Sequence, residues 1–365
     1  MRVGNITSAL ESFAPPALQE SYDNSGLLIG SVSDECQGVL LTVDVTPAVV
    51  REAIAKKCDL IVAHHPLIFK GLKRLNGYTP VEQAVIEAVR NGIAIYACHT
   101  SLDNAPEGVS KEMAKKLGLN DIATLDPQQG KLLKLVVYVP KDNVEEVRLA
   151  LFDAGCGGIG TYDSCSFASE GTGTFRPLQG SDPYVGTVGQ TEYQPETRLE
   201  VIVPSWLRRK AEEALLQVHP YEQPAYEFIQ PIATPTLYGC GAIGNVDRPI
   251  SSVELAQLVK KTFDSSVARC TDPERFTSIR RVAMCGGSGS FLIEQAIKSG
   301  AQAFITSDTK YHDFQDYSDS IFIIDIGHHE SENCTKEIFY RIITEKFPNF
   351  AVKYSETDTN PIKYL

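Results

Sequence analysis

The sequence predicts an α/β protein, in which a two-part layered α/β core is interrupted by a smaller inserted domain. In the core, short apolar runs alternate with amphipathic segments, a rhythm typical of strands and helices in a layered sheet. Between residues 131 and 230 the rhythm changes to two similar halves, and after Pro231 the first rhythm resumes. The expected segments are the first half of the core, the inserted domain and the second half of the core: residues 1–126, 127–231 and 232–365.

The first half of the core begins with a helix over residues 5–14, whose apolar residues recur at helical spacing and which Pro15 and Pro16 end. The strands that follow are apolar runs without an exposed face, as in the buried strands of a parallel sheet. Helical segments separate them. The expected strands lie at residues 39–43, 59–63 and 93–97, and the expected helices at about 47–57 and 80–91.

The inserted domain repeats one pattern. Residues 135–140 and 199–204 each read as a strand that ends in Val-Pro, and an amphipathic helix follows each of them. Two such strand–helix–strand halves predict a small ferredoxin-like α+β domain. The glycine-rich stretch 155–192 between them should hold hairpin strands and loops. It lacks the strand-to-helix context and the Lys-Ser/Thr ending of a phosphate loop.

The second half of the core returns to alternating strands and helices. Its strands should be the apolar runs at residues 281–285, 303–306 and 321–326, and a helix should cover residues 252–263. Residues 286–290, Gly-Gly-Ser-Gly-Ser, precede another helix. They either receive an anion on free backbone N–H groups or form a tight turn from strand to helix.

Composition limits the class of protein. The 365-residue chain has 43% hydrophobic and 22% charged residues, as average globular proteins do, and it is long enough for about two domains. Its formal net charge of −12 disfavours nucleic acid as a partner, since a phosphate backbone attracts clustered Lys and Arg. Nine cysteines without a CxxC pair indicate reduced thiols. With no signal segment and no apolar run of membrane-spanning length, we expect a cytoplasmic protein without a membrane partner.

Two adjacent imidazoles, His64 and His65, directly follow the strand at residues 59–63. Pro66 ends that strand because it has no N–H to donate to a neighbouring strand. Adjacent side chains on a strand point to opposite faces, so a fixed turn would help both rings to reach one place. Alone, such a pair is more often part of a polar loop than a metal site.

Asp103 has a similar position after the strand at residues 93–97, within the polar segment Cys98–Asn104. Open α/β sheets bind their ligands at the carboxyl ends of strands, so this segment and the His64-His65 pair should face one crevice. The alternative is that Asp103 caps a helix over residues 108–117 or lies in a turn.

A third cluster follows the strand at residues 321–326. If a helix begins near His328, then His328 and Glu332 lie four residues apart and share one helix face, whereas His329 and Glu330 point elsewhere. The alternative is that Glu332 only stabilises the helix N-terminus electrostatically while the histidines are exposed.

Together the three strand ends supply three imidazoles and two carboxylates. This set is too large for one tetrahedral zinc that keeps an open position, and it suits two divalent cations that share a carboxylate. Without a thiolate nearby, the set favours Zn, Fe or Mn over copper(I) or a cluster. The predicted metal ligands are His64, His65, Asp103, His328 and Glu332.

Seven segments of the chain, which are given at the end of this paragraph, are similar in sequence and in order to the motifs of the GTP cyclohydrolase I type 2 homologue family, the Nif-three-like dinuclear-metal proteins. The resemblance covers both halves of the core. The inserted domain is similar to one that longer bacterial members carry, whose fold is like that of PII and CutA regulators. The matching motifs are Asp23–Gly30, Val43–Thr46, Leu60–Pro66, His99–Asp103, Gly286–Gly289, Ser307–His312 and Gly327–Glu332.

The resemblance implies two metal ions per chain, with His64 and His65 on different metals and Glu332 as the bridge between them. It also implies that His99 and His312, which fall in the active-site motifs, lie next to the metals or carry protons. Members of the family resemble toroidal hexamers, so a homo-oligomer is expected.

One departure from the family pattern is the pair Ser307-Asp308, where many members have Gly-Asp. It leaves the predicted metal ligands unchanged and bears only on substrate contacts.

The resemblance implies a hydrolase whose substrate is a small molecule. If that substrate is GTP, it is a nucleotide. Its metals would activate water to open the imidazole ring of guanine, with release of formate. The acidic chain offers only Lys310 and the glycine segment 286–289 as candidates to hold a triphosphate. The alternatives are a non-enzymatic metal-handling or regulatory oligomer, which the likeness of the insertion to regulators favours, and an oligomer in which metals only fix the subunit fold.

Overall fold

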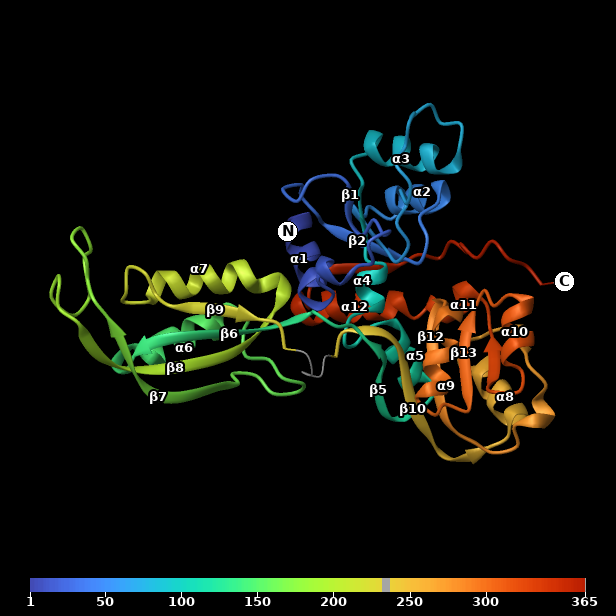
Figure 1. The fold of residues 1–365 in the computed structure, drawn as a ribbon. Coiled ribbons are helices and arrows are strands. Elements are labelled where there is room, and N and C mark those ends of the chain that lie inside the picture. The colour runs from blue at the N-terminus through green and yellow to red at the C-terminus, as the bar shows by residue number, and fades with distance from the viewer. Residues whose placement is uncertain (232–236, 365) are drawn as a thin grey trace. The chain divides into compact units, whose positions relative to one another are not determined.

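The computed structural model describes residues 1–231 and 237–364 of the chain. It divides into two compact units, as Figure 1 shows. The larger unit comprises Met1–Pro127 and Leu237–Leu365, and the smaller unit comprises Gln128–Thr236. The predicted start of the second half of the core, at residue 232, lies outside the described residues.

A five-stranded sheet forms one part of the larger unit, in the order β1-β4-β3-β2-β15. Its three central strands are parallel and buried along their whole length, as their unbroken apolar sequences predict, and β1 runs antiparallel at one edge. The strands are β1 (Gly26–Ile29), β2 (Gly38–Thr42), β3 (Leu60–Ala63), β4 (Ala94–Ala97) and β15 (Ala351–Tyr354).

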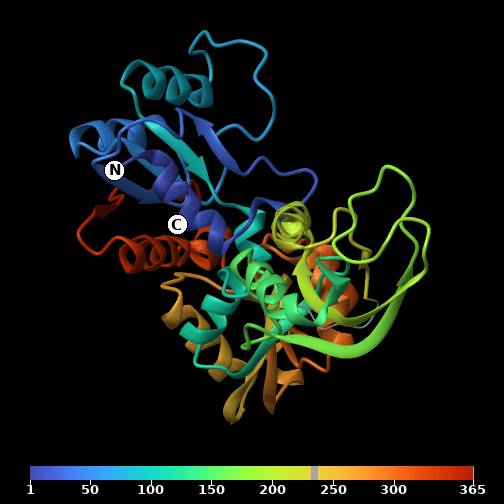
Figure 2. The same ribbon diagram turned by 90° about the vertical axis from the view of Figure 1, so that its left-hand side faces the viewer.

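Helices cover both faces of this sheet. On one face, α2 and α3 pack together, and their apolar residues share a core with Leu40, Ile61 and Ile95 of the strands. On the opposite face, α1 and α12 pack together, as both views of the ribbon show (Figures 1 and 2). The helices are α1 (Val3–Phe13), α2 (Pro47–Ala55), α3 (Pro80–Arg90) and α12 (Thr335–Lys346).

A six-stranded sheet forms the other part of the larger unit, in the order β11-β14-β13-β12-β10-β5. The strands β12, β13 and β14 are parallel, and the remaining strands pair antiparallel. The strands are β5 (Asn120–Pro127), β10 (Gly239–Ile250), β11 (Arg269–Cys270), β12 (Ile279–Ser288), β13 (Ala303–Ser307) and β14 (Phe322–Asp325). The associated helices are α4 (Thr100–Asp103), α5 (Val109–Lys116), α8 (Ser252–Thr262), α9 (Ile293–Lys298), α10 (Tyr311–Tyr317) and α11 (His328–Glu332).

The two sequence halves of the core exchange strands. From the first half, β5 pairs with β10 in the six-stranded sheet, and from the C-terminal segment β15 pairs in parallel with β2 in the five-stranded sheet. The two sheets are therefore one interlocked body rather than two domains in sequence. This exchange holds the carboxyl ends of β3, β4 and β14 near one another.

The smaller unit has the strand order β7-β8-β6-β9, all antiparallel, with two helices packed on the sheet through one apolar core. In chain order this is β6 (Leu132–Pro140), α6 (Val144–Asp153), β7 (Ser166–Phe175), β8 (Glu192–Pro204), α7 (Arg208–Val218) and β9 (Tyr226–Ile229). The arrangement is the ferredoxin-like one, so both the α/β class and the inserted α+β fold that the sequence predicts are confirmed.

Some element bounds differ from the prediction. The strand expected over residues 281–285 extends from Ile279 to Ser288 and includes three residues of the glycine segment, with a shift of register against β13 between Met284 and Ser288, where Gly287 has a φ of +63°. The helix expected to reach residue 57 ends at Ala55, and Lys57 then has a positive φ of 54°. The strands β5 and β10 are not among the predicted elements. No helix in the described part of the chain combines the length and the apolarity that crossing a membrane requires.

The carboxylate of Glu52 in α2 makes several contacts with the C-terminal segment. Its oxygens accept hydrogen bonds from the backbone N–H of Glu356 (2.8 Å), from the hydroxyl of Ser355 (2.6 Å) and from Thr357, and Lys56 forms an ion pair with it at 2.7 Å. Burial raises the pKa of Glu52, but these donors outweigh it and lower the pKa to about 2.

We predict that Glu52→Gln loosens β15. Removing the charge weakens several charged hydrogen bonds, so the free energy of unfolding should fall by about 1–3 kcal/mol and the amides of residues 352–354 should exchange faster in hydrogen-exchange measurements. Because the folded-state pKa is lowered, this stabilisation is present above about pH 4.3 and is lost as the pH falls towards 2. The control is Glu345→Gln, which removes an exposed carboxylate from α12. Equal exchange in both variants would contradict the role of Glu52.

Candidate metal centre

Three strand ends bring the five predicted ligands to one place in the larger unit. His64 and His65 directly follow β3, and their backbone N–H groups still bond to β2 at Thr42 and Val43. The other ligands belong to short helices that follow strands. Asp103 is the last residue of α4, after β4, while His328 and Glu332 begin and end α11, after β14.

The ring of His64 is completely buried and has a defined tautomer. Its Nδ1 lies 3.0 Å from the backbone oxygen of Cys98, which can only accept, so Nδ1 carries the hydrogen. In its neutral form the ring has a lone pair on Nε2. This atom is buried without a hydrogen-bond partner and lies 3.7 Å from both Asp103 Oδ1 and Glu332 Oε1. A buried lone pair that faces two carboxylates is suited to a cation.

His65 and His328 approach Glu332 from two sides. Their Nε2 atoms lie 2.9 Å and 3.0 Å from Glu332 Oε2, and 3.3 Å from each other. The oxygen is nevertheless buried without a properly directed hydrogen bond, because neither ring nitrogen aims at it. Two ring nitrogens and a carboxylate oxygen thus converge on a common point, as the ligands of a metal ion do.

Carboxylates that the sequence prediction missed orient these two rings. Asp44 Oδ1 lies 2.7 Å from His65 Nδ1, and Asp308 Oδ2 lies 2.6 Å from His328 Nδ1. Such partners fix the tautomer of a metal-binding histidine and raise its basicity. Both carboxylates come one or two residues after a strand, so the strand-end rule that found the ligands could also have found them. Asp308 has a positive φ of 55°, a strained conformation of the kind that concentrates at functional sites.

A carboxylate also holds the Nδ1 of His99. This nitrogen lies 2.8 Å from Oδ1 of Asp23, whose side chain is fully buried and also accepts hydrogen bonds from Ser25 and Thr100. Burial raises the pKa of Asp23, but these partners lower it far below its usual value, so the carboxylate stays charged. The ring of His99 lies 5.2 Å from that of His64. His99 is therefore part of the cluster, with Nε2 as its free nitrogen.

Asp103 belongs to the cluster and does not cap a helix. The residue at the N-cap of α5 is Gly108, so the capping alternative is wrong. Burial raises the pKa of Asp103, and the nearby imidazoles of His64 and His99 only partly offset this. Because burial makes this carboxylate costly to charge, a cation bound beside it would favour its charged form.

The glycine segment ends β12 and leads directly into a short helix at Ser290–Leu292, and the backbone N–H groups of its three glycines are already occupied. Gly287 donates to the hydroxyl of Ser331 at 2.9 Å, Gly289 to Thr306 at 3.0 Å and Gly286 to Ser110 at 3.3 Å. They are not free for an anion, so of the two alternatives only the tight turn holds. Ser307, the departure from the family pattern, donates its hydroxyl to the backbone oxygen of Gly287 at 2.6 Å and is buried. It supports this turn instead of facing a substrate.

His312 lies apart from the other predicted residues. It is exposed on α10, where its ring contacts that of Tyr311 at 5.4 Å, and it has no recorded contact with the cluster among the described residues. Its catalytic role stays a prediction from the family motif alone.

The donor set fits metal ions. Two groups of three side chains could each hold an ion, because the ligand atoms within each group lie within 4.8 Å of one another. The first group is His64, His65 and His99. The second group is His65, His328 and Glu332, so His65 belongs to both. Imidazoles and carboxylates without a thiolate suit Zn, Fe or Mn. The edge of the cluster remains accessible, since the side chains of Asp103 and His328 are 25% and 32% exposed.

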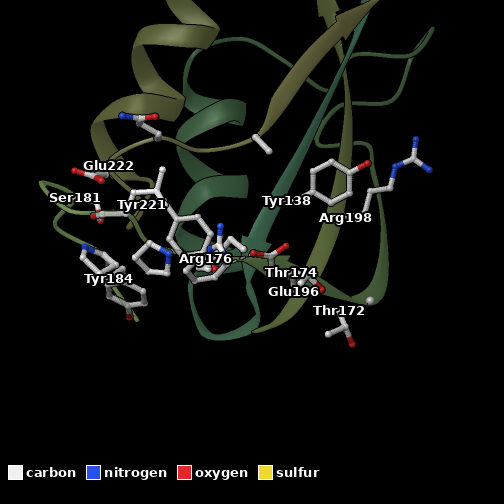
Figure 3. Close-up of a pocket in the computed structure, with 18 of the residues that line it drawn as sticks. Tyr138, Thr172, Thr174, Arg176, Ser181, Tyr184, Glu196, Arg198, Tyr221 and Glu222 are labelled. Carbon is white, nitrogen blue, oxygen red and sulfur yellow. Dashed lines mark hydrogen bonds between the residues drawn. The ribbon is translucent and has the colours of Figure 1, made fainter. Parts of the chain in front are cut away.

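A separate cavity of about 880 Å³ lies in the smaller unit and contains none of the predicted ligands (Figure 3). Tyr184 and Tyr221 line one side, while Tyr138 and Arg198 lie on the other. The hydroxyl of Tyr221 donates to Glu196 at 2.8 Å. The ligand atoms that converge, as those of a metal site do, lie in the larger unit.

The carboxylate of Glu332 depends on the missing side chain of Gly287. A Cβ at this position would lie 2.1 Å from Glu332 Oε1, and φ is +63°. Gly300 has a similar φ of +76° but open space around the same position.

We predict that Gly287→Ala displaces Glu332 and lowers metal content, measured by elemental analysis of the purified protein. Gly300→Ala introduces the same backbone strain, about 1 kcal/mol, without the clash, so it should retain the metal. Loss of metal in both variants, or in neither, would contradict the role of Gly287.

Metal binding should release protons. Burial lowers the pKa of His65 and His328, but the adjacent carboxylates raise them to about 10 and about 9. A metal takes the neutral rings, so at pH 7 it has to displace protons that these carboxylates hold on the imidazole pair.

We predict that up to about two protons per chain are released and that affinity for Zn²⁺ rises between about pH 6 and 9. Isothermal titration in buffers of different ionisation enthalpy measures both quantities. Affinity that is independent of pH in this range would mean that His65 and His328 do not bind the metal.

Comparison with known proteins identifies the family of this chain. Residues 1–361 match the family Duf34/NIF3 (NGG1p interacting factor 3). The chain is 37% identical to the GTP cyclohydrolase 1 type 2 homolog of Bacillus subtilis, over 99% of this chain and 98% of the relative. A Bacillus cereus protein related to NIF3 has a crystal structure with a TM-score of 0.87, 35% identity, and coverage of 100% of this chain and 99% of that one. Staphylococcus aureus SA1388 follows with a TM-score of 0.79, 31% identity and coverage of 100% and 99%. The chain belongs to the Duf34/NIF3 family.

Proposed function

We propose that the protein binds two divalent metal ions, Zn, Fe or Mn, and acts as a metal-dependent hydrolase of the GTP cyclohydrolase type. The observation that carries the proposal is the buried Nε2 of His64, which has no hydrogen-bond partner and faces the carboxylates of Asp103 and Glu332 at 3.7 Å. The names of the curated relatives support the reaction class.

Glu332 is suited to bridge two ions. Its Oε1 faces His64, whereas its Oε2 faces His65 and His328, so each oxygen serves a different group of imidazoles. Burial opposes its charge, but the imidazoles of His64 and His328 hold the pKa of its carboxyl well below the usual value. A charged bridging oxygen reduces the repulsion between two cations.

Bound metal ions would supply Lewis acidity and a water that is deprotonated near neutral pH. The residues of the chain supply position and proton transfer. Asp23 holds His99 through Nδ1, which leaves Nε2 to accept a proton from water or to deliver one to the ring nitrogen that is released. With GTP, two hydrolytic steps at C8 of guanine would open the imidazole ring and release formate.

The test is formate release from GTP by protein loaded with Zn²⁺, Mn²⁺ or Fe²⁺. Asp103→Ala and Glu332→Ala should each lower the rate more than about 100-fold, since even the outer partners of metal ligands are worth about 10- to 100-fold. The control is Glu345→Ala, which removes an exposed carboxylate from α12.

Formate release that survives both substitutions would contradict the dinuclear mechanism. Two metals per chain without formate release from GTP would favour the metal-handling or regulatory alternative. Light scattering of the same samples tests the proposed homo-oligomer, for which the family resemblance implies a hexamer.

A further inference from the structure

The loop that follows the histidine pair is basic, although the chain as a whole is acidic. Between β3 and α3, Lys70, Lys73 and Arg74 are exposed and have no ion-pair partner in the described parts of the chain. The formal net charge of the protein is −12, so unpaired cations grouped within five residues are a local reversal of charge.

The same loop begins with an exposed aromatic ring beside the metal cluster. Phe69 is 45% exposed, and its ring centroid lies 6.3 Å from that of His99. Tyr22, which is 65% exposed, lies 6.5 Å from Phe69. The side-chain amide of Asn24 donates to the backbone oxygen of Ile68, which fixes the start of the loop. Two rings are thus held at the edge of the cluster with their surfaces open to solvent.

We propose that Tyr22 and Phe69 bind the planar ring of the substrate and that Lys70, Lys73 and Arg74 bind its phosphate groups. The substrate class is then a phosphorylated compound with a planar heteroaromatic ring. This inference rests on the proposed function, because it assigns the substrate of the same metal site.

The order of these groups along the loop matches the chemistry of such a substrate. Aromatic rings offer a stacking surface to a heteroaromatic ring, which would then lie next to His99 and the metals. Lys70 follows Phe69 directly. Arg74 lies five residues after Phe69, so at most about 18 Å of extended chain separates the two residues. Ammonium and guanidinium groups over this span can follow a chain of phosphates that leads away from the ring.

The sequence offered two other candidates for the triphosphate, Lys310 and the glycine segment. Lys310 is exposed at the N-cap of α10 and supplies a single cation, whereas the loop supplies three. The backbone N–H groups of Gly286, Gly287 and Gly289, which the sequence singled out for a triphosphate, are already occupied. The basic loop therefore takes the role that the sequence analysis gave to the glycine segment.

The experiment compares binding of GTP, guanosine and inorganic tripolyphosphate to the metal-loaded, full-length protein by isothermal titration. For the wild-type protein, we expect GTP to bind at least about tenfold more tightly than guanosine. Substituting Gln at Lys70, Lys73 and Arg74 together should remove this preference and weaken tripolyphosphate binding. Phe69→Ala should weaken GTP and guanosine equally and leave tripolyphosphate unchanged. Metal content should stay at the wild-type value in every variant.

A matched control removes three exposed cations elsewhere: Lys261, Arg280 and Arg281, each replaced by Gln. Arg280 and Arg281 lie at the start of β12, six or more residues and about 20 Å along the strand before Gly287. This control changes the net charge equally, and it should keep the preference for GTP. A similar loss in the control, or a preference that survives in the loop variant, would overturn the inference.

The outcome is separable from that of the proposed function. Loop-dependent binding of GTP without formate release would refute the reaction and leave the binding role standing. Formate release with an unchanged KM in the loop variant would refute the binding role alone. Because Leu72 and Leu75 are also exposed in this loop, light scattering accompanies each titration. If the loop variant loses GTP binding only because its assembly dissociates, the inference is overturned, and the loop instead forms a contact between subunits.

Discussion

The structure around the cluster depends on one buried charge, the carboxylate of Glu332. Its side chain is only 4% exposed, and a charged group in such a place is stable only when neighbours replace the water that it loses. Three imidazoles surround its two oxygens, and Gly287 leaves the space that it occupies. The ligands come from both sheets, so the exchange of β5 and β15 between sequence halves is what holds the charge in place.

A second constraint acts on the rings themselves. An imidazole binds metal through one nitrogen only if the other nitrogen is held, and each histidine of the cluster has such a partner at Nδ1. For His65, His99 and His328 the partner is a carboxylate, and for the fully buried His64 it is a backbone oxygen. The neutral partner suits the most buried ring, because a further charge there would cost more to desolvate. Together these contacts turn every free Nε2 towards the same region.

Much of this arrangement was predictable from local pattern. Polar residues directly after buried strands identified His64, His65 and Asp103, and helical spacing joined His328 to Glu332. Asp44 and Asp308 also follow buried strands. A carboxylate after a strand can equally cap a helix or lie in a turn, so its role is assigned only when its hydrogen-bond partner is known. The glycine segment shows the opposite case. Its sequence allowed an anion site, and only the hydroxyl groups of Thr306 and Ser331, far along the chain, show that its N–H groups are taken.

The sequence by itself determined the α/β class, the inserted ferredoxin-like domain and the residues that could act as ligands, because periodicity, strand ends and side-chain chemistry are local properties. Tertiary structure decided which of these residues meet. It placed His99 within the cluster and left His312 exposed on α10, although both stand in similar motifs. It also placed Phe69 beside His99. Such contacts depend on how strands far apart in the chain pair with one another, and pairing depends on the whole packed sheet.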